Sequence, residues 1–216
     1  MSPIAKYSKP LLYLITDRKA LHPAKGANEQ RRLIELIERS MAAGVDLIQI
    51  RERDLPARHL LYLTQSAVRA AASTGARVLV NDRIDVALSA GAGVHLATRS
   101  IPARVVRATF GGEIMIGVST HNVEEAESAA RGGADFLVFG PVFETESKMA
   151  YGPPVGIKAL GEVCARVNIP VLALGGISLS NFRHTLDAGA SGIAAISLFA
   201  KAKSLPEIVK IIKGAD

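Results

Sequence analysis

The stretch Met41-Ala-Ala-Gly-Val-Asp-Leu-Ile-Gln-Ile50 contains the kind of junction that decides the fold of this chain. A helical segment ends at a glycine, which readily takes the left-handed conformation that closes many helices, and a short apolar run follows at once. Three other helix ends carry nearly the same phrase: Ser-Ala-Gly-Ala-Gly93, Arg-Gly-Gly-Ala-Asp135 and Asp-Ala-Gly-Ala-Ser191. The recurrence indicates repeated helix-to-strand units, in which the glycines are structural and carry no chemistry.

Eight short apolar runs occur along the chain, with helical segments between them. They are apolar on both faces instead of alternating, which indicates parallel strands that are covered on both sides. The runs are Leu11–Thr16, Val45–Ile50, Arg77–Val80, Gly93–Leu96, Ile114–Val118, Asp135–Phe139, Pro170–Leu174 and Gly192–Ile196, and helices are predicted at Asn28–Ala43, Ala57–Ser73 and Val123–Arg131. Eight alternating units predict an α/β fold, a single-domain (β/α)8 TIM barrel that spans residues 1–216.

Composition narrows the class of protein. The chain has 216 residues, of which 49% are hydrophobic, and this is enough for one sizeable core. A single cysteine, Cys164, excludes an internal disulfide framework and fits a reducing, cytoplasmic compartment. The first residues do not resemble a signal peptide and no apolar run is long enough to span a bilayer, so we expect no membrane role.

The net charge of +6 is unevenly distributed. Residues 1–108 contain 17 Lys and Arg against 9 Asp and Glu, whereas residues 109–216 contain 9 against 11. A basic surface can bind nucleic acid, but the chain has neither a run of Lys and Arg nor any Trp. A small anionic ligand explains the charge better, so we expect no nucleic-acid partner.

In a barrel of this kind the active site is built from the carboxyl ends of the strands and the loops that follow them. This rule selects the candidate site residues of the chain. They are Gln49, Arg51 and Arg53 after the second strand, Asn81 and Asp82 after the third, Ser119 and His121 after the fifth, then Thr145, Ser147, Lys148, Gly175, Gly176, Ile196 and Ser197 on the later loops.

Several of these residues are typical of sites that bind a phosphate or diphosphate. The loop that carries Thr145, Ser147 and Lys148 offers hydroxyls, amides and an ammonium, although an ordinary surface loop is the alternative. Gly175 and Gly176, with amides near Ser197, lie where barrels often bind phosphate; a tight turn is the alternative.

Among the charged and titratable side chains, Asp82 and His121 have two interpretations each. Arg51 is suited to bind an anion with two parallel hydrogen bonds, while Arg53 and Lys148 neutralise the rest of its charge. Asp82 is either a Mg²⁺ ligand or a helix cap. His121 either transfers a proton or is a hydrogen-bonded wall residue. For Glu52 we expect an ion pair in the wall, and for His95 a packed structural role.

Taken together, these phrases resemble the thiamine-phosphate synthase and TenI superfamily over nearly the whole chain. The matching phrases are Tyr13-Leu-Ile-Thr-Asp17, Gln49-Ile-Arg-Glu-Arg53, Val80-Asn-Asp-Arg83, Gly93-Val-His-Leu96, Gly117-Val-Ser-Thr-His121, Phe139-Gly-Pro-Val-Phe143 with Thr145, Ser147 and Lys148, and Ala173-Leu-Gly-Gly-Ile177. The resemblance implies a barrel that handles the phosphorylated thiazole of thiamine biosynthesis.

Two reactions occur in this superfamily. The synthase couples aminopyrimidine methyl diphosphate with thiazole phosphate and releases pyrophosphate, using Mg²⁺. Its pattern implies that Gln49 contacts the pyrimidine, that Arg51, Asn81 and Asp82 serve the diphosphate and Mg²⁺, and that Thr145, Ser147 and Lys148 hold the leaving group. TenI-type proteins instead shift a double bond in a thiazole phosphate by proton transfer, in which a histidine matching His121 takes part.

The chain departs from the synthase pattern at two places. Arg53 stands where synthases usually have Lys, and Ala97-Thr-Arg-Ser100 stands where Gly-Gln-x-Asp would supply a second Mg²⁺ carboxylate. The retained Asp82 favours the synthase, with the tautomerase or a non-catalytic paralogue that binds thiazole phosphate or thiamine phosphate as alternatives. Small phosphorylated pyrimidine and thiazole substrates are the expected partners. The sequence leaves open whether the chain forms a homo-oligomer.

Overall fold

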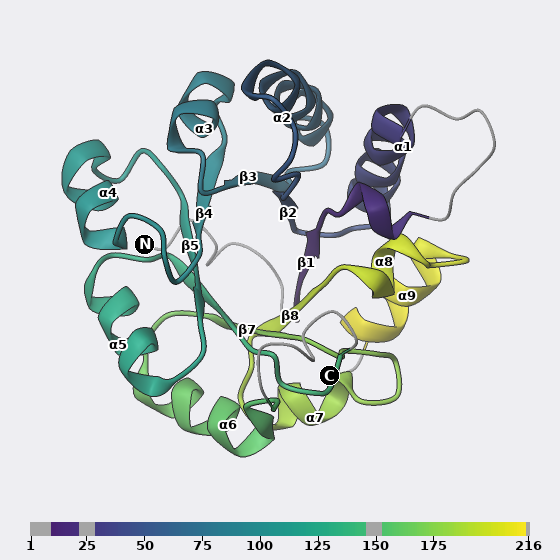
Figure 1. The fold of residues 1–216 in the computed structure, drawn as a ribbon. Coiled ribbons are helices and arrows are strands. Elements are labelled where there is room, and N and C mark those ends of the chain that lie inside the picture. The colour runs from purple at the N-terminus through teal and green to yellow at the C-terminus, as the bar shows by residue number, and fades with distance from the viewer. Residues whose placement is uncertain (1–9, 22–28, 146–152, 215–216) are drawn as a thin grey trace.

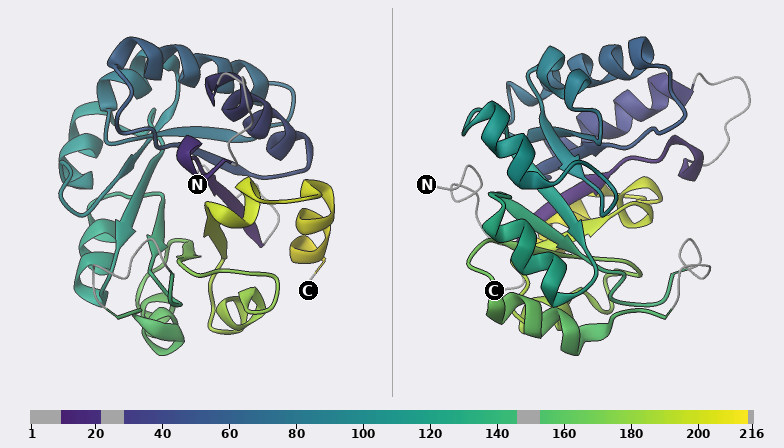
Figure 2. Two further views of the ribbon diagram at one scale, coloured as in Figure 1. Left: turned by 45° about the vertical axis from the view of Figure 1, so that its right-hand side comes forward. Right: turned by 60° about the vertical axis from the view of Figure 1, so that its left-hand side comes forward.

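The computed structural model describes residues 10–21, 29–145 and 153–214 and shows a closed parallel barrel. Strands pair in chain order from β1 to β8, and β8 pairs with β1 to close the ring. The connecting helices lie outside the barrel, as Figures 1 and 2 show. The predicted (β/α)8 architecture is therefore confirmed.

The strands are short and the helices that cover them are of ordinary length. The strands are β1 Leu11–Ile15, β2 Leu47–Ile50, β3 Arg77–Asn81, β4 Gly93–Leu96, β5 Ile116–Thr120, β6 Phe136–Phe139, β7 Val171–Leu174 and β8 Gly192–Ala195. The helices are η1 Arg18–Ala20, α1 Glu29–Ala42, α2 Ala57–Ala71, α3 Ile84–Ala90, α4 Ala103–Phe110, α5 Val123–Arg131, α6 Gly156–Arg166, α7 Phe182–Asp187, α8 Ser197–Ala200 and α9 Leu205–Lys213. Within the described residues, none of these helices combines the length and apolar composition needed to cross a membrane.

The predicted and observed elements differ most at β5. The apolar pattern predicts a strand from Ile114, whereas the strand begins at Ile116 and continues to Thr120. The neighbouring strands explain the shift, because Ile116 is opposite Val94 of β4 and Thr120 is opposite Phe139 at the end of β6. Pairing partners, which a single run of sequence does not contain, set the ends of the strand.

Alternate residues of each strand enter two different cores. Leu11, Tyr13 and Ile15 of β1 point into the barrel with Phe136. Leu12 and Leu14 pack outward in the layer between strands and helices. Both faces of β1 are buried, which explains why its sequence is continuously apolar and does not alternate.

The repeated glycines take the backbone conformation that the sequence predicts. Gly44, Gly91, Gly133 and Gly189 have φ angles of 99°, 68°, 86° and 97° at the helix-to-strand junctions. Residues with a Cβ are strained in this region, so glycine lets each helix stop and the chain turn directly into the next strand.

Two of these junctions also carry an aspartate that joins neighbouring elements. Asp135 Oδ2 accepts hydrogen bonds from the amide of Ile116 on β5, at 2.7 Å, and from Arg107 Nη2 of α4, at 2.8 Å. Asp46 repeats the arrangement: Oδ2 accepts from the amide of Leu12 on β1 at 2.8 Å, and Oδ1 accepts from Lys213 of α9 at 2.7 Å. Each carboxylate thus ties the start of the adjacent strand to a covering helix.

We predict that Asp135→Ala lowers the free energy of unfolding by about 2–4 kcal/mol, because it leaves the Ile116 amide and the Arg107 guanidinium without this acceptor. Chemical denaturation measures the loss. The matched control is Asp85→Ala, which breaks an exposed pair with Arg83 and should cost less than about 1 kcal/mol. Equal losses in the two variants would show that Asp135 does not tie the barrel together.

Candidate active site

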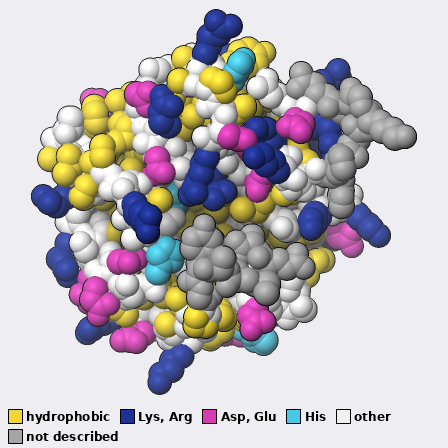
Figure 3. All heavy atoms as spheres, in the orientation of Figure 1, with side chains coloured by type: hydrophobic (Ala, Val, Ile, Leu, Met, Phe, Trp, Pro, Cys, Tyr) yellow, Lys and Arg dark blue, Asp and Glu magenta, His cyan; other side chains and the backbone are white. Residues whose placement is uncertain are grey.

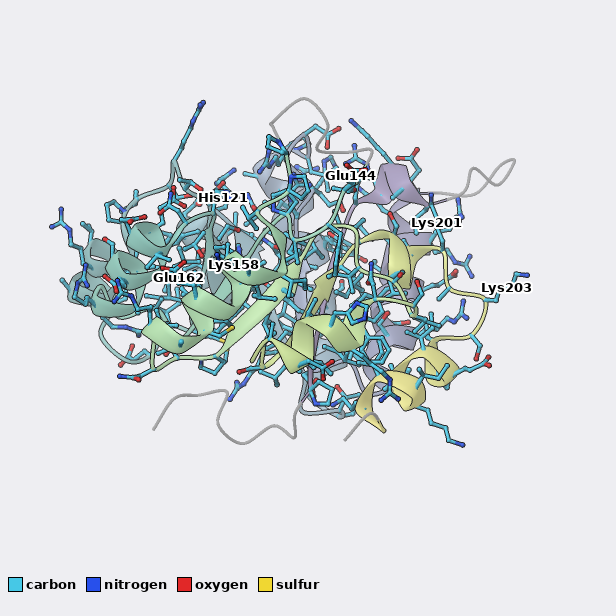
Figure 4. All side chains as sticks on the ribbon, turned by 90° about the horizontal axis from the view of Figure 1, so that it is seen from below. His121, Glu144, Lys158, Glu162, Lys201 and Lys203 are labelled. Atoms are coloured by element: carbon cyan, nitrogen blue, oxygen red, sulfur yellow. The ribbon has the colours of Figure 1, made fainter. Side chains whose placement is uncertain are left out.

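A cavity of about 330 Å³ opens at the carboxyl ends of the strands. Figure 4 shows labelled His121 and Glu144 at this same end of the molecule, and in Figure 3, which views the barrel from that end, Lys and Arg side chains gather near its middle. Eleven of the sequence-predicted site residues line the cavity: Gln49, Arg51, Arg53, Asn81, Ser119, His121, Thr145, Gly175, Gly176, Ile196 and Ser197. Segments far apart in the sequence therefore converge on one site.

Arg51 is a partly buried cation on the cavity wall. Its amide donates to Thr16 Oγ1 at 2.9 Å, which anchors the backbone, but no other described residue hydrogen-bonds its guanidinium. Burial, followed by the charge of Arg53, lowers the pKa of Arg51 below its usual value. An anion in the cavity would relieve both effects, since it offers acceptors and opposite charge.

A chain of hydrogen bonds orients the amide groups on the floor of the site. Asn81 Nδ2 donates to Asp82 Oδ2 at 2.8 Å, and Gln49 Nε2 donates to Asn81 Oδ1 at 3.2 Å. A carboxylate only accepts, so Asp82 determines which way Asn81 faces, and Asn81 in turn determines Gln49. Gln49 Oε1 is left as an acceptor, and Gln49 lines the cavity.

Asp82 does not cap α3, so the helix-cap interpretation is wrong. The helix begins after Arg83 without a side-chain cap. The Asp82 carboxylate instead accepts hydrogen bonds from the Ser100 hydroxyl and from the amide of Ala97, the latter at 3.2 Å. Asp82 has a φ of 59°, a left-handed conformation that aspartate tolerates better than most residues, and this turn directs the carboxylate toward the loop after β4.

Ser119 connects the cavity to a buried polar pair in the barrel interior. His95 Nε2 lies 2.8 Å from Ser119 Oγ, and His95 Nδ1 lies 3.2 Å from the Tyr13 hydroxyl. Tyr13 and His95 are 0% and 1% exposed. The packed position expected for His95 is confirmed, and its bond to a cavity residue is an additional finding.

His121 lies on the cavity wall with one ring nitrogen engaged. Its Nδ1 is 2.5 Å from the carbonyl oxygen of Gly140. A carbonyl oxygen only accepts, so Nδ1 carries a proton, and Nε2 of the neutral ring is left as a proton acceptor. The backbone amide of His121 donates to Glu125, which holds the loop against α5.

The loop after β7 needs both of its glycines. Gly175 and Gly176 have φ angles of 99° and 65°, and a Cβ at either position would come within 2.5 Å of Pro141 or of the Glu144 carbonyl oxygen. The glycines thus let this loop pack under the loop after β6, where Thr145 lines the cavity. The tight-turn interpretation is confirmed, and it leaves a role in phosphate binding open to test.

Glu52 lies in the wall beside the site, as its position in the sequence predicts. It is 4% exposed and accepts from Arg18 Nη1 at 3.0 Å and from the Arg18 amide at 3.1 Å. Arg18 also pairs with Asp54, at 2.6 Å. These contacts join the loops after β1 and β2 at the rim.

Two residues of the predicted set lie outside the described part of the chain, and one residue outside that set lines the cavity. Ser147 and Lys148 lie outside the described residues, so their predicted roles stay predictions. Asp17 lines the cavity but is absent from the predicted set. It follows β1 directly, and the strand-end rule that selected the other residues also selects it.

Known proteins resemble this chain along most of its length. The sequence profile of a family described as "Thiamine monophosphate synthase" matches residues 12–199. A relative from Geobacter sulfurreducens, whose name places it provisionally among the thiamine-phosphate synthases, is 50% identical over 86% of this chain and 84% of its own length. The thiamine-phosphate synthase of a Roseiflexus species is 40% identical over 87% of this chain and 77% of its own length.

Solved structures agree with the sequence relatives. The structure of a thiamine phosphate pyrophosphorylase from Pyrococcus furiosus superimposes with a TM-score of 0.81 and 31% identity, covering 95% of this chain and 94% of that one. The profile match alone covers most of the barrel, from β1 into α8. The chain therefore belongs to the thiamine monophosphate synthase family.

Proposed function

We propose that the protein is a thiamine-phosphate synthase, which couples aminopyrimidine methyl diphosphate with thiazole phosphate and releases pyrophosphate. The observation that carries the proposal is Arg51, a partly buried cation on the cavity wall whose guanidinium has no hydrogen-bond partner in the described part of the chain. A diphosphate supplies the missing acceptors. Family membership and the names of the relatives support the same reaction.

The chemistry requires the cavity to stabilise negative charge. As the bond to the diphosphate breaks, charge builds on the leaving oxygens, and fixed cations lower the barrier by being in place beforehand. Arg51 and Arg53 both line the cavity and provide two such cations. The chain of hydrogen bonds on the cavity floor adds Gln49 Oε1, an acceptor suited to the exocyclic amine of a pyrimidine.

Apolar walls complete the site. Ile15, Val138, Leu174 and Ala194 line the cavity from four adjacent strands, β1, β6, β7 and β8. Such walls suit flat heteroaromatic rings and limit access of water, which would otherwise capture a carbocation formed when the diphosphate leaves.

For Mg²⁺, the predicted ligand Asp82 is not among the residues that line the cavity, and its carboxylate accepts hydrogen bonds from Asn81, Ala97 and Ser100. Among the described residues, no group of three or more His, Cys, Asp or Glu is arranged as a metal site. Asp82 offers one carboxylate, and Mg²⁺ typically takes one or two carboxylates together with phosphate oxygens and water. When bound, the ion would neutralise charge on the leaving group. Ser100 donates to Asp82 and supplies no second carboxylate.

We predict that Arg51→Ala lowers kcat for thiamine phosphate formation about 10²–10³-fold, because it removes a cation placed where charge develops. Arg51→Lys should lose less, since it keeps the charge but not the planar fork. Product formation from the two phosphorylated halves with Mg²⁺ measures the effect. Arg69→Ala, on an exposed turn of α2, is the control. Failure of the wild type to form any product would overturn the proposed function.

A second prediction concerns position 100, where this chain has a serine and no second carboxylate. Ser100→Asp puts a second carboxylate beside Asp82, so the affinity for a divalent ion should rise about tenfold in the presence of pyrophosphate. Titration with Mn²⁺, followed by electron paramagnetic resonance, measures this without turnover. Ser100→Ala serves as control, because it removes the hydroxyl without adding charge. If Ser100→Asp bound Mn²⁺ no more tightly than Ser100→Ala, joint binding by Asp82 and position 100 would be refuted.

One observation favours a second candidate function, the tautomerisation of a thiazole phosphate. His121 lies on the cavity wall with Nδ1 engaged by the Gly140 carbonyl, which leaves Nε2 as the ring nitrogen available to a ligand, an arrangement suited to a general base.

The two candidates differ in how they depend on His121. If the tautomerase proposal holds, His121→Gln should lower isomerisation of a thiazole carboxylate phosphate about 10²–10⁴-fold and leave the affinity for that ligand nearly unchanged. Proton exchange followed by NMR measures isomerisation, and calorimetry measures affinity. An unchanged isomerisation rate would dismiss His121 as the base.

A further inference from the structure

Three residues from three strands form a continuous polar chain that begins in the barrel interior and ends at the cavity. Tyr13 of β1, His95 of β4 and Ser119 of β5 are linked by contacts of 3.2 Å and 2.8 Å. Phe136 packs edge-on against the Tyr13 ring, with ring centres 5.5 Å apart, and lies 6.1 Å from the His95 ring. A polar pair in such an apolar setting is costly unless every proton has an acceptor.

The sequence makes room for this chain of contacts. A Cβ on Gly117 would lie 2.7 Å from His95 Nδ1 and 2.5 Å from the Phe136 ring. Gly117 is opposite both His95 and Phe136 in the barrel ladder. A larger residue on β5 would therefore displace the imidazole from its place between Tyr13 and Ser119.

The direction of the hydrogen bonds follows from the groups available. Within the described residues, the Tyr13 hydroxyl has one hydrogen-bond partner, His95 Nδ1. If Nδ1 carried the proton, the phenol proton would be buried without an acceptor, at a cost of about 1–3 kcal/mol. The tautomer with Nδ1 bare and Nε2 protonated avoids this cost: Tyr13 donates to Nδ1, and Nε2–H donates to Ser119 Oγ.

Burial keeps both members of the pair in the required protonation state. Desolvation lowers the pKa of His95 to about 3, so the ring is neutral at physiological pH. Desolvation also raises the pKa of Tyr13 well above its usual value, so the phenol keeps its proton. The neutral ring has one bare nitrogen and one protonated nitrogen, as the chain of contacts requires.

We propose that Tyr13 and His95 are positioning residues that hold the Ser119 hydroxyl as a hydrogen-bond donor toward the cavity, where it binds an acceptor atom of the substrate. Ser119 Oγ already accepts from Nε2–H, and no other described residue accepts its proton. The proton is therefore free for a ligand. Ser119 lines the cavity with Gln49, so the floor offers one donor and one acceptor. The inference rests on the proposed function for the identity of the acceptor, an unprotonated nitrogen of the aminopyrimidine ring.

The first test reads the tautomer directly in the ligand-free protein. Long-range ¹H–¹⁵N NMR spectra distinguish a protonated ring nitrogen from a bare one, and His95→Gln identifies the His95 signals among the five histidines. We expect Nε2 protonated and Nδ1 bare at neutral pH. A proton on Nδ1, or an average of the two tautomers, would overturn the inference whether or not the protein is a synthase.

The second test asks whether Tyr13 acts through Ser119. Tyr13→Phe should weaken calorimetric binding of thiamine phosphate about tenfold in the wild-type background and less than about twofold in a Ser119→Ala background, because the two residues belong to one chain. Tyr62→Phe, at a tyrosine that is 60% exposed, is the matched control and should change nothing. Equal losses in the two backgrounds would show that Tyr13 acts by packing alone.

These tests separate the inference from the proposed function. If the protein has no synthase activity but shows the Nε2–H tautomer and the non-additive losses, the proposed function is wrong and the positioning role of Tyr13 and His95 stands. If the protein is an active synthase but Nδ1 of His95 is protonated, the proposed function stands and the positioning role is wrong. If Tyr13→Phe fails to fold, the wild-type tautomer alone decides.

Discussion

The closed parallel ladder is the constraint on which the rest of the structure depends. With β8 paired to β1, none of the eight described strands has a free edge, and all eight carboxyl ends meet at one end of the barrel. That geometry alone brings Gln49, Ser119 and Gly176 to one cavity, although they are far apart in sequence. The opposite end carries the glycine turns and the aspartates Asp46 and Asp135, which fasten strands to helices. Stability and chemistry are thus served by different ends of the same strands.

Two groups set the direction of the hydrogen bonds that lead to the cavity. One can only accept a hydrogen bond, and the other must donate one. The Asp82 carboxylate starts one series, which ends with Gln49 Oε1 as an acceptor. The Tyr13 phenol starts the other, which ends with the Ser119 hydroxyl as a donor. Only the first series depends on a charged group, the Asp82 carboxylate. A ring edge that carries a bare nitrogen beside an amine matches this donor and acceptor pair, whereas a purely apolar ring leaves both unsatisfied.

The sequence predicts the fold and much of the cavity because both follow from local patterns. Runs that are apolar on both faces indicate the strands, and Gly44 or Gly133 marks a turn that a larger residue cannot make without strain. Strand ends then locate Arg51 or Ser119 with no further information. Contacts between distant segments are not predictable in this way. The partner of His95 lies 82 positions away, and the Asp82 carboxylate turned toward Ser100, 18 positions away, when its own helix offered a cap. Local propensity favoured that cap, and tertiary hydrogen bonds outweighed it.

Arg51 shows that a residue placed for ligand binding can lower the stability of the fold when no ligand is bound. Its guanidinium has lost part of its hydration and lies near a second cation, Arg53, which together lower its pKa. The negative charges of Asp17, Glu52 and Asp82 act in the opposite direction, but these side chains make no hydrogen bond to the guanidinium. The unligated barrel therefore holds an unfavourable charge that the ladder and the two cores must offset. A bound diphosphate removes that cost, so the free energy released on binding includes relief of strain already present in the protein. Ligand affinity and intrinsic stability are accordingly opposed at this residue, and a substitution that neutralises Arg51 would improve the second while destroying the first.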